Sequence, residues 1–294
     1  MKVNQRLYEI AVPCWPLRRG KTRWLNLVTW LLGIQPYGFL KLKRVGDYRL
    51  RLDPGDPNDL HYYFQNVGAG YSDLVRRLLR EGDCVVDVGA NVGYFSAICA
   101  QQVGRQGRVH AVEASPIMAE RLSQTIGEVV GGPIRLHHSA LWSNSGVIAF
   151  NVASNSGWSS LRENATFDTK ATVQVPAVTL DDLVTREGIG RVRLLKLDIE
   201  GAETDALVGG QGLLQSSHLD FVLVEVEANR LRAFNHSGKD LADLMSQNGY
   251  RPVCIIENDR VIPVTEERRI PGGANCDYLY AREGLYQSTT ELLS

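Results

Sequence analysis

Residues that could move a proton stand together at the end of one apolar segment. The run Val192–Asp198 is largely apolar, which predicts a buried strand ending at its aspartate. Because side chains alternate along a strand, Lys196 and Asp198 project from the same face. A strand-end carboxylate with a lysine beneath it can position a hydroxyl or take its proton. We therefore rank Asp198 as the first catalytic candidate, Lys196 as its orienting partner, and Glu200, just beyond the strand, as the third.

Other carboxylates near this strand are weaker candidates. Glu200 and Glu203 stand at the start of a predicted helix, where acidic side chains oppose the helix dipole, so a purely structural role stays open for both. Glu225 and Glu227 end the next predicted strand on a shared face and are second-rank candidates. No pair of histidines or carboxylates has a spacing specific for a metal, so no metal site is predicted.

A second group of residues is suited to holding a nucleotide-like cofactor. Between residues 85 and 95 an apolar strand runs into a glycine turn and then a helix. Gly89 lets the backbone pass close to a ligand, and Gly93 lets the start of the helix pack closely. Glu113 follows 20 residues after Gly93, at the end of the second predicted strand. A carboxylate in that place can accept both hydroxyls of a ribose.

The composition of the glycine turn bears on which cofactor it holds. A dinucleotide site favours Gly-x-Gly-x-x-Gly, with backbone amides facing a pyrophosphate. This turn instead has an acid first, in the order Asp87, Gly89, Asn91 and Gly93. Asp87 would repel a pyrophosphate, but it could meet the cationic methionine portion of S-adenosylmethionine through water. A nicotinamide-dependent oxidoreductase stays open as an alternative, as does a turn with no ligand.

Strands and helices that alternate from Cys84 onward must position these residues. The predicted strands are Cys84–Val88, Arg108–Glu113, Ile134–Ala140, Val192–Asp198 and Phe221–Glu227. The predicted helices are Tyr71–Arg80, Tyr94–Val103, Pro116–Val129, Ala202–Val208 and Lys239–Asn248. Such alternation predicts an α/β fold, with a mostly parallel, Rossmann-like sheet and helices on both faces.

Two regions depart from this alternation. Residues 146–178 predict an inserted antiparallel pair, Gly146–Val152 and Ala171–Val178, around a Ser/Gly/Trp loop at 155–160. The hydroxyls of that loop can bond a polar substrate, and a surface loop without a role is the alternative. Near the end of the chain, three further strands predict an antiparallel edge to the sheet. They are Arg251–Glu257, Arg260–Val264 and Cys276–Arg282.

Residues 1–68 predict an N-terminal extension to a catalytic domain over 69–294. An amphipathic helix is expected within 1–37 and a hairpin over 39–52. Residues 1–52 carry 11 Lys/Arg against two acids, so this segment has a charge of +9 and the remainder −10. Basic residues and tryptophans near a helix favour an anionic membrane surface. The competing interpretation packs this helix on the catalytic domain or on a second subunit, as in a homodimer.

Composition narrows the location and the partners. The five cysteines are scattered and form no CxxC pair, which favours a reducing compartment. The longest early apolar run, at 24–34, is too short to span a bilayer, which takes about 20 residues. A cytoplasmic location is therefore expected, with peripheral contact at the inner face of the membrane as an option. The acidic main body argues against nucleic acid as a substrate.

Three motifs of this chain together resemble the FkbM family of methyltransferases. They are the turn from Asp87 to Phe95, the Leu-Asp-Asp-Leu run at 180–183 and the Lys-x-Asp-x-Glu-Gly-x-Glu run at 196–203. The last two are more specific than the glycine turn. The resemblance covers roughly residues 70–280, and the first 60 residues carry no part of it.

The resemblance implies a class I methyltransferase fold and transfer of a methyl group from S-adenosylmethionine to a hydroxyl of a small molecule, sugar or glycan. It further implies that the end of the third strand, with Ser139 and Ala140, lies beside the adenine. The residues expected around the cofactor are Asp87, Gly89, Ala90, Asn91, Gly93, Tyr94, Phe95, Glu113, Ala114, Ser139 and Ala140. A non-catalytic module that keeps this fold is the alternative from another class.

Overall fold

The computed structural model describes residues 41–53, 56, 59, 62, 69–153, 159–161, 169–257, 259–264 and 276–293. The helix expected within 1–37 lies outside the described residues, as does most of the loop at 155–160. No helix in the described part of the chain is both long and apolar enough to cross a membrane.

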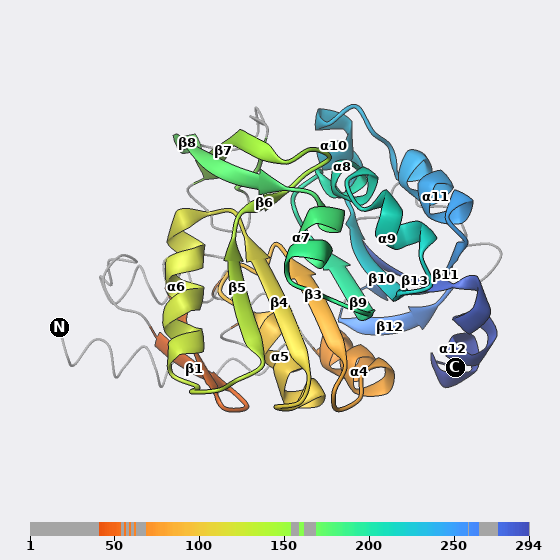
Figure 1. Ribbon diagram of the computed structural model, residues 1–294, viewed down its shortest axis with the longest axis horizontal. Coiled ribbons are helices and arrows are strands. Elements are labelled where there is room, and N and C mark those ends of the chain that lie inside the picture. The colour runs from red at the N-terminus through yellow and green to blue at the C-terminus, as the bar shows by residue number, and fades with distance from the viewer. Residues whose placement is uncertain are drawn as a thin grey trace, which may run out of the picture.

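The core is one eight-stranded sheet with the order β12-β11-β13-β10-β9-β3-β4-β5 (Figure 1). Its strands are β3 (Cys84–Val88), β4 (Arg108–Glu113), β5 (Ile134–His138), β9 (Val192–Leu197), β10 (Leu219–Val226), β11 (Tyr250–Glu257), β12 (Arg260–Pro263) and β13 (Cys276–Arg282). The strands β5, β4, β3, β9 and β10 pair in parallel. The mostly parallel, Rossmann-like sheet predicted from the sequence is thus confirmed.

Antiparallel strands complete one side of the sheet. β13 pairs antiparallel with both β10 and β11, and β12 pairs antiparallel with β11 at the edge. The predicted antiparallel edge strand is confirmed in β12. A second antiparallel strand, β13, lies inside the sheet although it comes last in the chain. Chain order therefore does not give strand order on this side.

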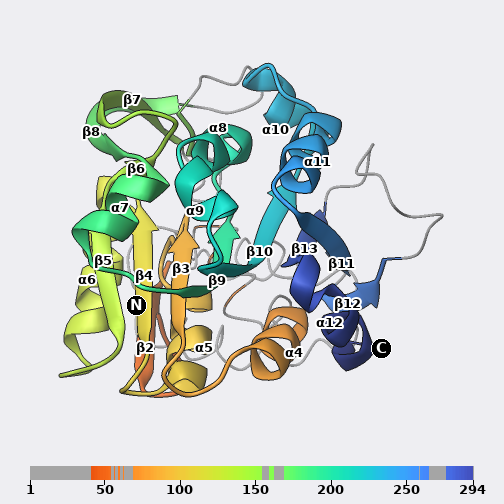
Figure 2. The same ribbon diagram turned by 45° about the vertical axis from the view of Figure 1, so that its right-hand side comes forward.

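Helices cover both faces because successive residues of each strand point to opposite sides. One face packs on α4 (Ala69–Leu78), α5 (Tyr94–Val103) and α6 (Pro116–Gly127). The other packs on α7 (Leu180–Arg186), α8 (Glu203–Val208), α9 (Gln211–Gln215) and α11 (Gly238–Gln247), as Figure 2 shows. In β9, for example, Leu194 belongs to the first core and Leu195 and Leu197 to the second. Two further helices are α10 (Ala228–Ala233) and α12 (Tyr286–Leu293).

The inserted region forms its own small sheet beyond the carboxyl ends of β4 and β5 (Figure 2). β7 (Gly146–Ala153) pairs antiparallel with β8 (Thr169–Val178), as predicted, and β6 (Ala140–Leu141) pairs in parallel with β8. The predicted strand Ile134–Ala140 is wrong at its end. The Ser139 N–H donates to the carbonyls of Glu113 (3.1 Å) and His137 (3.0 Å), which closes β5 and redirects the chain into the small sheet.

Near its N-terminus the described chain forms the predicted hairpin, β1 (Lys41–Val45) and β2 (Tyr48–Leu52). Leu50 and Leu52 are buried in the same hydrophobic core as Leu122 of α6. Whether the extension ends at residue 68 stays a prediction. The short helices α7, α9, α10 and α12 are not among the helices predicted from the sequence.

Candidate functional site

The candidate site lies where the strand order reverses, between β3 and β9. Chain connections leave these two strands in opposite directions, and ligands of open α/β sheets bind outside the carboxyl ends at such a point. Asp87 is the fourth residue of β3, and Asp198 directly follows β9. The sheet therefore brings the predicted cofactor turn and the predicted catalytic carboxylate side by side.

Lys196 connects the two aspartates at this point. Its Nζ lies 2.8 Å from Asp198 Oδ2 and 3.9 Å from Asp87 Oδ1. The Lys196 side chain is 6% exposed and that of Asp198 36%, so the lysine lies beneath the carboxylate as predicted. Asp87 is fully buried, and its Oδ2 accepts a hydrogen bond of 2.5 Å from the Ser96 hydroxyl. The contacts of Asp87 are thus made within the protein, below the surface of the turn.

This pairing sets the charges of the three groups. Burial alone would raise the pKa of Asp198, but the Lys196 ammonium outweighs burial and holds it below its ordinary value. Burial would lower the pKa of Lys196, but the carboxylates of Asp198 and Asp87 outweigh it and raise it. Burial raises the pKa of Asp87. Asp198 is consequently ionised at neutral pH. Of the two aspartates, it is the one that solvent or a substrate can reach.

Arg230 of α10 forms ion pairs with three further carboxylates near Asp198. It contacts Glu200 closely, Glu225 at 3.1 Å and Glu227 at 2.7 Å. Burial raises the pKa of Glu200 to about 9 against the opposing effect of Arg230, and burial together with the Asp198 charge raises that of Glu225 well above its usual range. Glu200 therefore lies next to Asp198, as expected for a third candidate, but its carboxylate pairs with an arginine that the sequence does not identify.

The loop after β9 is held by backbone contacts as well. Glu203 is buried, and its Oε1 accepts hydrogen bonds from the N–H groups of Ile199 (2.9 Å) and Gly201 (3.2 Å). Glu200 has a left-handed φ of 61°, and Gly201 has a φ of 107°. A Cβ on Gly201 would lie 2.5 Å from the Arg230 carbonyl oxygen. The Glu-Gly pair is thus a tight turn packed against α10.

The glycine turn is built on contacts within the chain. Gly89 has a φ of +78°, and a Cβ there would lie 1.9 Å from the carbonyl oxygen of Asp198. Gly93 has a φ of +87°, and a Cβ there would lie 2.4 Å from Leu122 Cδ1. Both glycines are required by close approach and by the left-handed backbone, before any ligand is considered.

Glu113 fastens the same turn to β4. Its Oε2 accepts from the N–H of Asn91 and its Oε1 from the N–H of Ser115, each at 2.7 Å. Burial raises its pKa to about 7, although both backbone donors act in the opposite direction. Each carboxylate oxygen can accept a second hydrogen bond, so the expected contact with ribose hydroxyls is compatible with these bonds.

Three residues near Asp198 are not identified from the sequence, namely Tyr62, Tyr71 and Asp277. Tyr71 of α4 donates a hydrogen bond to Asp277 Oδ2, and Asp277 pairs in register with Glu225 of β10. Tyr62 stacks on Tyr94 with ring centroids 4.9 Å apart. A charged residue at the start of an apolar strand was the signal for Asp277. Neither tyrosine has a sequence signal, because their partners lie far away in the chain.

Residues 87–252 match the Methyltransferase FkbM domain family. The chain belongs to this family. The matched range includes the glycine turn, the Leu-Asp-Asp-Leu run and the strand that ends at Asp198, so the resemblance seen in the sequence is confirmed. The protein is therefore an S-adenosylmethionine-dependent methyltransferase with a class I fold, and the nicotinamide and non-catalytic alternatives are set aside.

Individual relatives of this FkbM methyltransferase differ in how much of the chain they match. Hexuronic acid methyltransferase AglP of Haloferax volcanii is 30% identical over 183 residues, which is 60% of this chain and 69% of AglP. A protein-L-isoaspartate O-methyltransferase of Ignicoccus hospitalis is 42% identical over 106 residues, 30% of this chain and 50% of the relative. Among solved structures, S-adenosyl-L-methionine-bound fibrillarin of Aeropyrum pernix covers 81% of this chain and 84% of its own at 12% identity, with a TM-score of 0.43.

Buried polar atoms without a partner test whether the family cofactor fits. Ser139 Oγ and Asn91 Oδ1 are buried and have no hydrogen-bond partner among the residues that the structure describes. They belong to the loops after β5 and β3, where the adenosyl group is expected. A polar ligand there would supply the missing bonds. Four other residues expected around the cofactor are buried in or beside these loops, namely Ala90, Tyr94, Phe95 and Ala140. Ala114 is half-buried. The residues present fit S-adenosylmethionine, and the individual cofactor contacts stay predictions.

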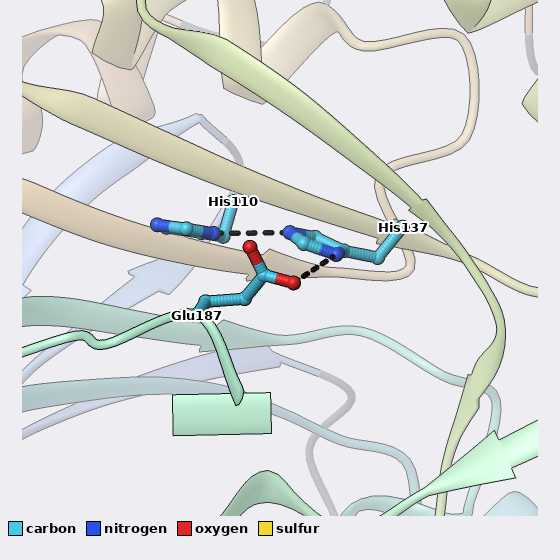
Figure 3. Close-up of side chains that lie close together, drawn as sticks. All are labelled: His110, His137 and Glu187. Atoms are coloured by element: carbon cyan, nitrogen blue, oxygen red, sulfur yellow. Dashed lines mark hydrogen bonds and ion pairs between the residues drawn. The ribbon is translucent and has the colours of Figure 1, made fainter. Parts of the chain in front are cut away.

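A second cluster of titratable residues lies on the α7 side of the sheet (Figure 3). His110 Nδ1 and His137 Nε2 face each other at 3.0 Å, and His137 Nδ1 lies 3.8 Å from Glu187 Oε1. Burial lowers both histidine pKa values, that of His137 to about 4, so both rings are neutral.

Neutral imidazoles can bind metals, but the contacts here suit a hydrogen-bonded network. The two ring nitrogens point directly at each other, as one N–H donor and one acceptor do (Figure 3). Glu187 is already neutralised by Arg135 at 3.0 Å and Arg186 at 3.3 Å. The cluster joins the C-terminal end of α7 to β4 and β5.

Proposed function

We propose that this methyltransferase acts on a hydroxyl group of a sugar, a glycan or another small hydroxylated molecule. The observation that carries the proposal is the reachable, ionised carboxylate of Asp198, held by Lys196 at the switch point of the sheet. Methylation of an oxygen releases the hydroxyl proton, and a carboxylate in hydrogen-bond reach can receive it. The hexuronic acid methyltransferase among the relatives supports a sugar as the acceptor.

In this reaction separate residues bind the cofactor and receive the proton. S-adenosylmethionine supplies the methyl group when bound. Asp198 accepts the hydrogen bond of the acceptor hydroxyl and takes its proton as the new carbon–oxygen bond forms. Lys196 keeps Asp198 ionised and fixes its orientation from below. Glu113 and the glycine turn hold the cofactor at the end of β4 and β3, so that the two reactants meet in line.

Release of S-adenosylhomocysteine tests this proposal. The purified chain is incubated with S-adenosylmethionine and a panel of glycosides, alcohols, amines and carboxylic acids, and methylated products are identified by mass spectrometry. We expect turnover with glycosides and an added methyl group on oxygen. Methylation of amines or carboxylates only would contradict the proposal, whereas the cofactor assignment would stand.

A further inference from the structure

A row of three carboxylates lies where β9 and β10 end and β13 begins. Leu197 of β9 pairs with Val224 of β10, so the next residues, Asp198 and Glu225, are neighbours. Glu225 in turn pairs with Asp277 of β13. With adjacent strands about 4.8 Å apart, Asp198 and Asp277 stand roughly 10 Å apart along the row. A single sugar unit could place hydroxyls against both of them.

The cations of the site lie behind these carboxylates. Lys196 is buried beneath Asp198, with its Nζ 5.4 Å from the centre of the Phe95 ring. Arg230 is only 16% exposed and is surrounded by its three glutamates. At neutral pH the ionised carboxylates that an acceptor meets in this row are those of Asp198 and, above about pH 6, Asp277, whereas the positive charges of Lys196 and Arg230 are covered.

The site also resists further negative charge. Burial together with the neighbouring Asp198 charge raises the pKa of Asp277 to about 6. The pKa of Glu200 is raised to about 9, and that of Glu225 well above its usual range. Burial is the largest cause of each of these pKa shifts, and the ionised carboxylate of Asp198 adds repulsion to it. An acceptor that carries its own carboxylate would meet the same repulsion.

We propose that this site selects an uncharged sugar over a hexuronic acid, with Asp277, oriented by Tyr71, receiving a second hydroxyl of the acceptor. The inference rests on the proposed function and narrows its substrate class. It separates this chain from the relative named as a hexuronic acid methyltransferase, with which it shares 30% identity over 183 residues. In this arrangement Asp198 meets the reacting hydroxyl, and Asp277 is a specificity-determining residue that sets which sugar can lie across the row.

Binding and turnover of two matched glycosides test the inference. The probes are p-nitrophenyl β-D-glucopyranoside and p-nitrophenyl β-D-glucuronide, which differ by one carboxylate. Binding is measured on the full chain loaded with S-adenosylhomocysteine, and methylation is measured in parallel with S-adenosylmethionine. We expect the glucoside to bind at least about tenfold more tightly than the glucuronide, since like charges at close range are costly.

The outcomes separate the two proposals. Equal or tighter binding of the glucuronide, or binding of neither probe, overturns the inference. Selective binding of the glucoside without methylation of either probe supports the inference on charge and contradicts the proposed function. The pH dependence of binding adds a second readout. The ratio of glucoside affinity to glucuronide affinity should increase as pH rises through about 6, where Asp277 ionises. The groups facing Asp277 are Tyr71, Asp198, Lys196 and Glu225.

Two variants assign the effect to Asp277. In Asp277→Asn the ratio of glucoside affinity to glucuronide affinity should fall by about threefold or more, because the amide carries no charge. The change of this ratio near pH 6 should also disappear. Asp243→Asn, the same change on the exposed face of α11, is the matched control and should keep both. An unchanged preference in a folded Asp277→Asn protein would overturn the role of Asp277. Should that variant not fold, the pH series on the wild-type chain decides the same point.

Discussion

Gly89 lies so close to the carbonyl oxygen of Asp198 that no side chain fits between them: a Cβ would come within 1.9 Å of that oxygen. The contact joins the glycine turn after β3 to the strand end that carries the catalytic candidate. Asp198 N–H also donates to the carbonyl of Val88 at 3.1 Å. The two halves of the site therefore have a fixed relative position, which an in-line transfer requires.

Substitution at this contact should damage both halves of the site. In Gly89→Ala the methyl group must displace the Asp198 backbone, and the left-handed backbone itself costs about 1 kcal/mol or more. We expect a lower melting temperature and weaker cofactor binding, measured by thermal unfolding and calorimetry. Gly249→Ala is the matched control, since Gly249 has a φ of +77° but nothing within 4 Å of its added Cβ. If both variants lose the same stability and bind cofactor equally well, the contact is unimportant.

Glu113 should control cofactor binding in a pH-dependent way. Its pKa is raised to about 7, and the ionised form is the better acceptor for two ribose hydroxyls. Because binding favours the ionised form, affinity for S-adenosylhomocysteine should increase as pH rises through about 7 and then level off. Glu113→Ala should weaken binding by about 1–3 kcal/mol. Glu113→Gln should remove the pH dependence, and a pH-independent wild-type affinity would argue against the ribose contact.

Asp198 should affect chemistry far more than binding. The Asp198→Asn side chain keeps the shape but cannot take a proton, so turnover should fall by about 100-fold or more while cofactor affinity changes little. Because Lys196 holds the pKa of Asp198 below its ordinary value, wild-type activity should not decline from titration of this group until well below neutral pH. Turnover within a few-fold of wild type would make Asp198 a structural residue.

Residues 1–37 are expected to bind an anionic membrane surface. This segment lies outside the described residues, so the prediction rests on its basic residues and on Trp15, Trp24 and Trp30. In a flotation assay the full chain should rise with vesicles that contain anionic lipid and should be released by salt. Neutral vesicles are the control. Equal flotation of a chain lacking 1–37 would show that another surface is responsible.

The sequence by itself determined the local parts of this protein. Apolar runs and glycine positions depend on near neighbours, so the strands of the parallel sheet, the turn at Asp87 to Gly93 and the inserted antiparallel pair follow from them. The alternation of side chains along β9 likewise placed Lys196 and Asp198 on one face. Each of these strands and turns is a short, continuous segment of the chain.

Only the tertiary structure decided which distant residues share the site. The last strand enters the sheet between β10 and β11, and that register sets Asp277 beside Glu225 and within reach of Tyr71. Arg230 joins the carboxylates from α10, a helix that the sequence pattern does not predict. Side-chain periodicity is a local signal, whereas strand order and register depend on how whole elements bury their apolar faces together, and that packing arises only in the folded chain.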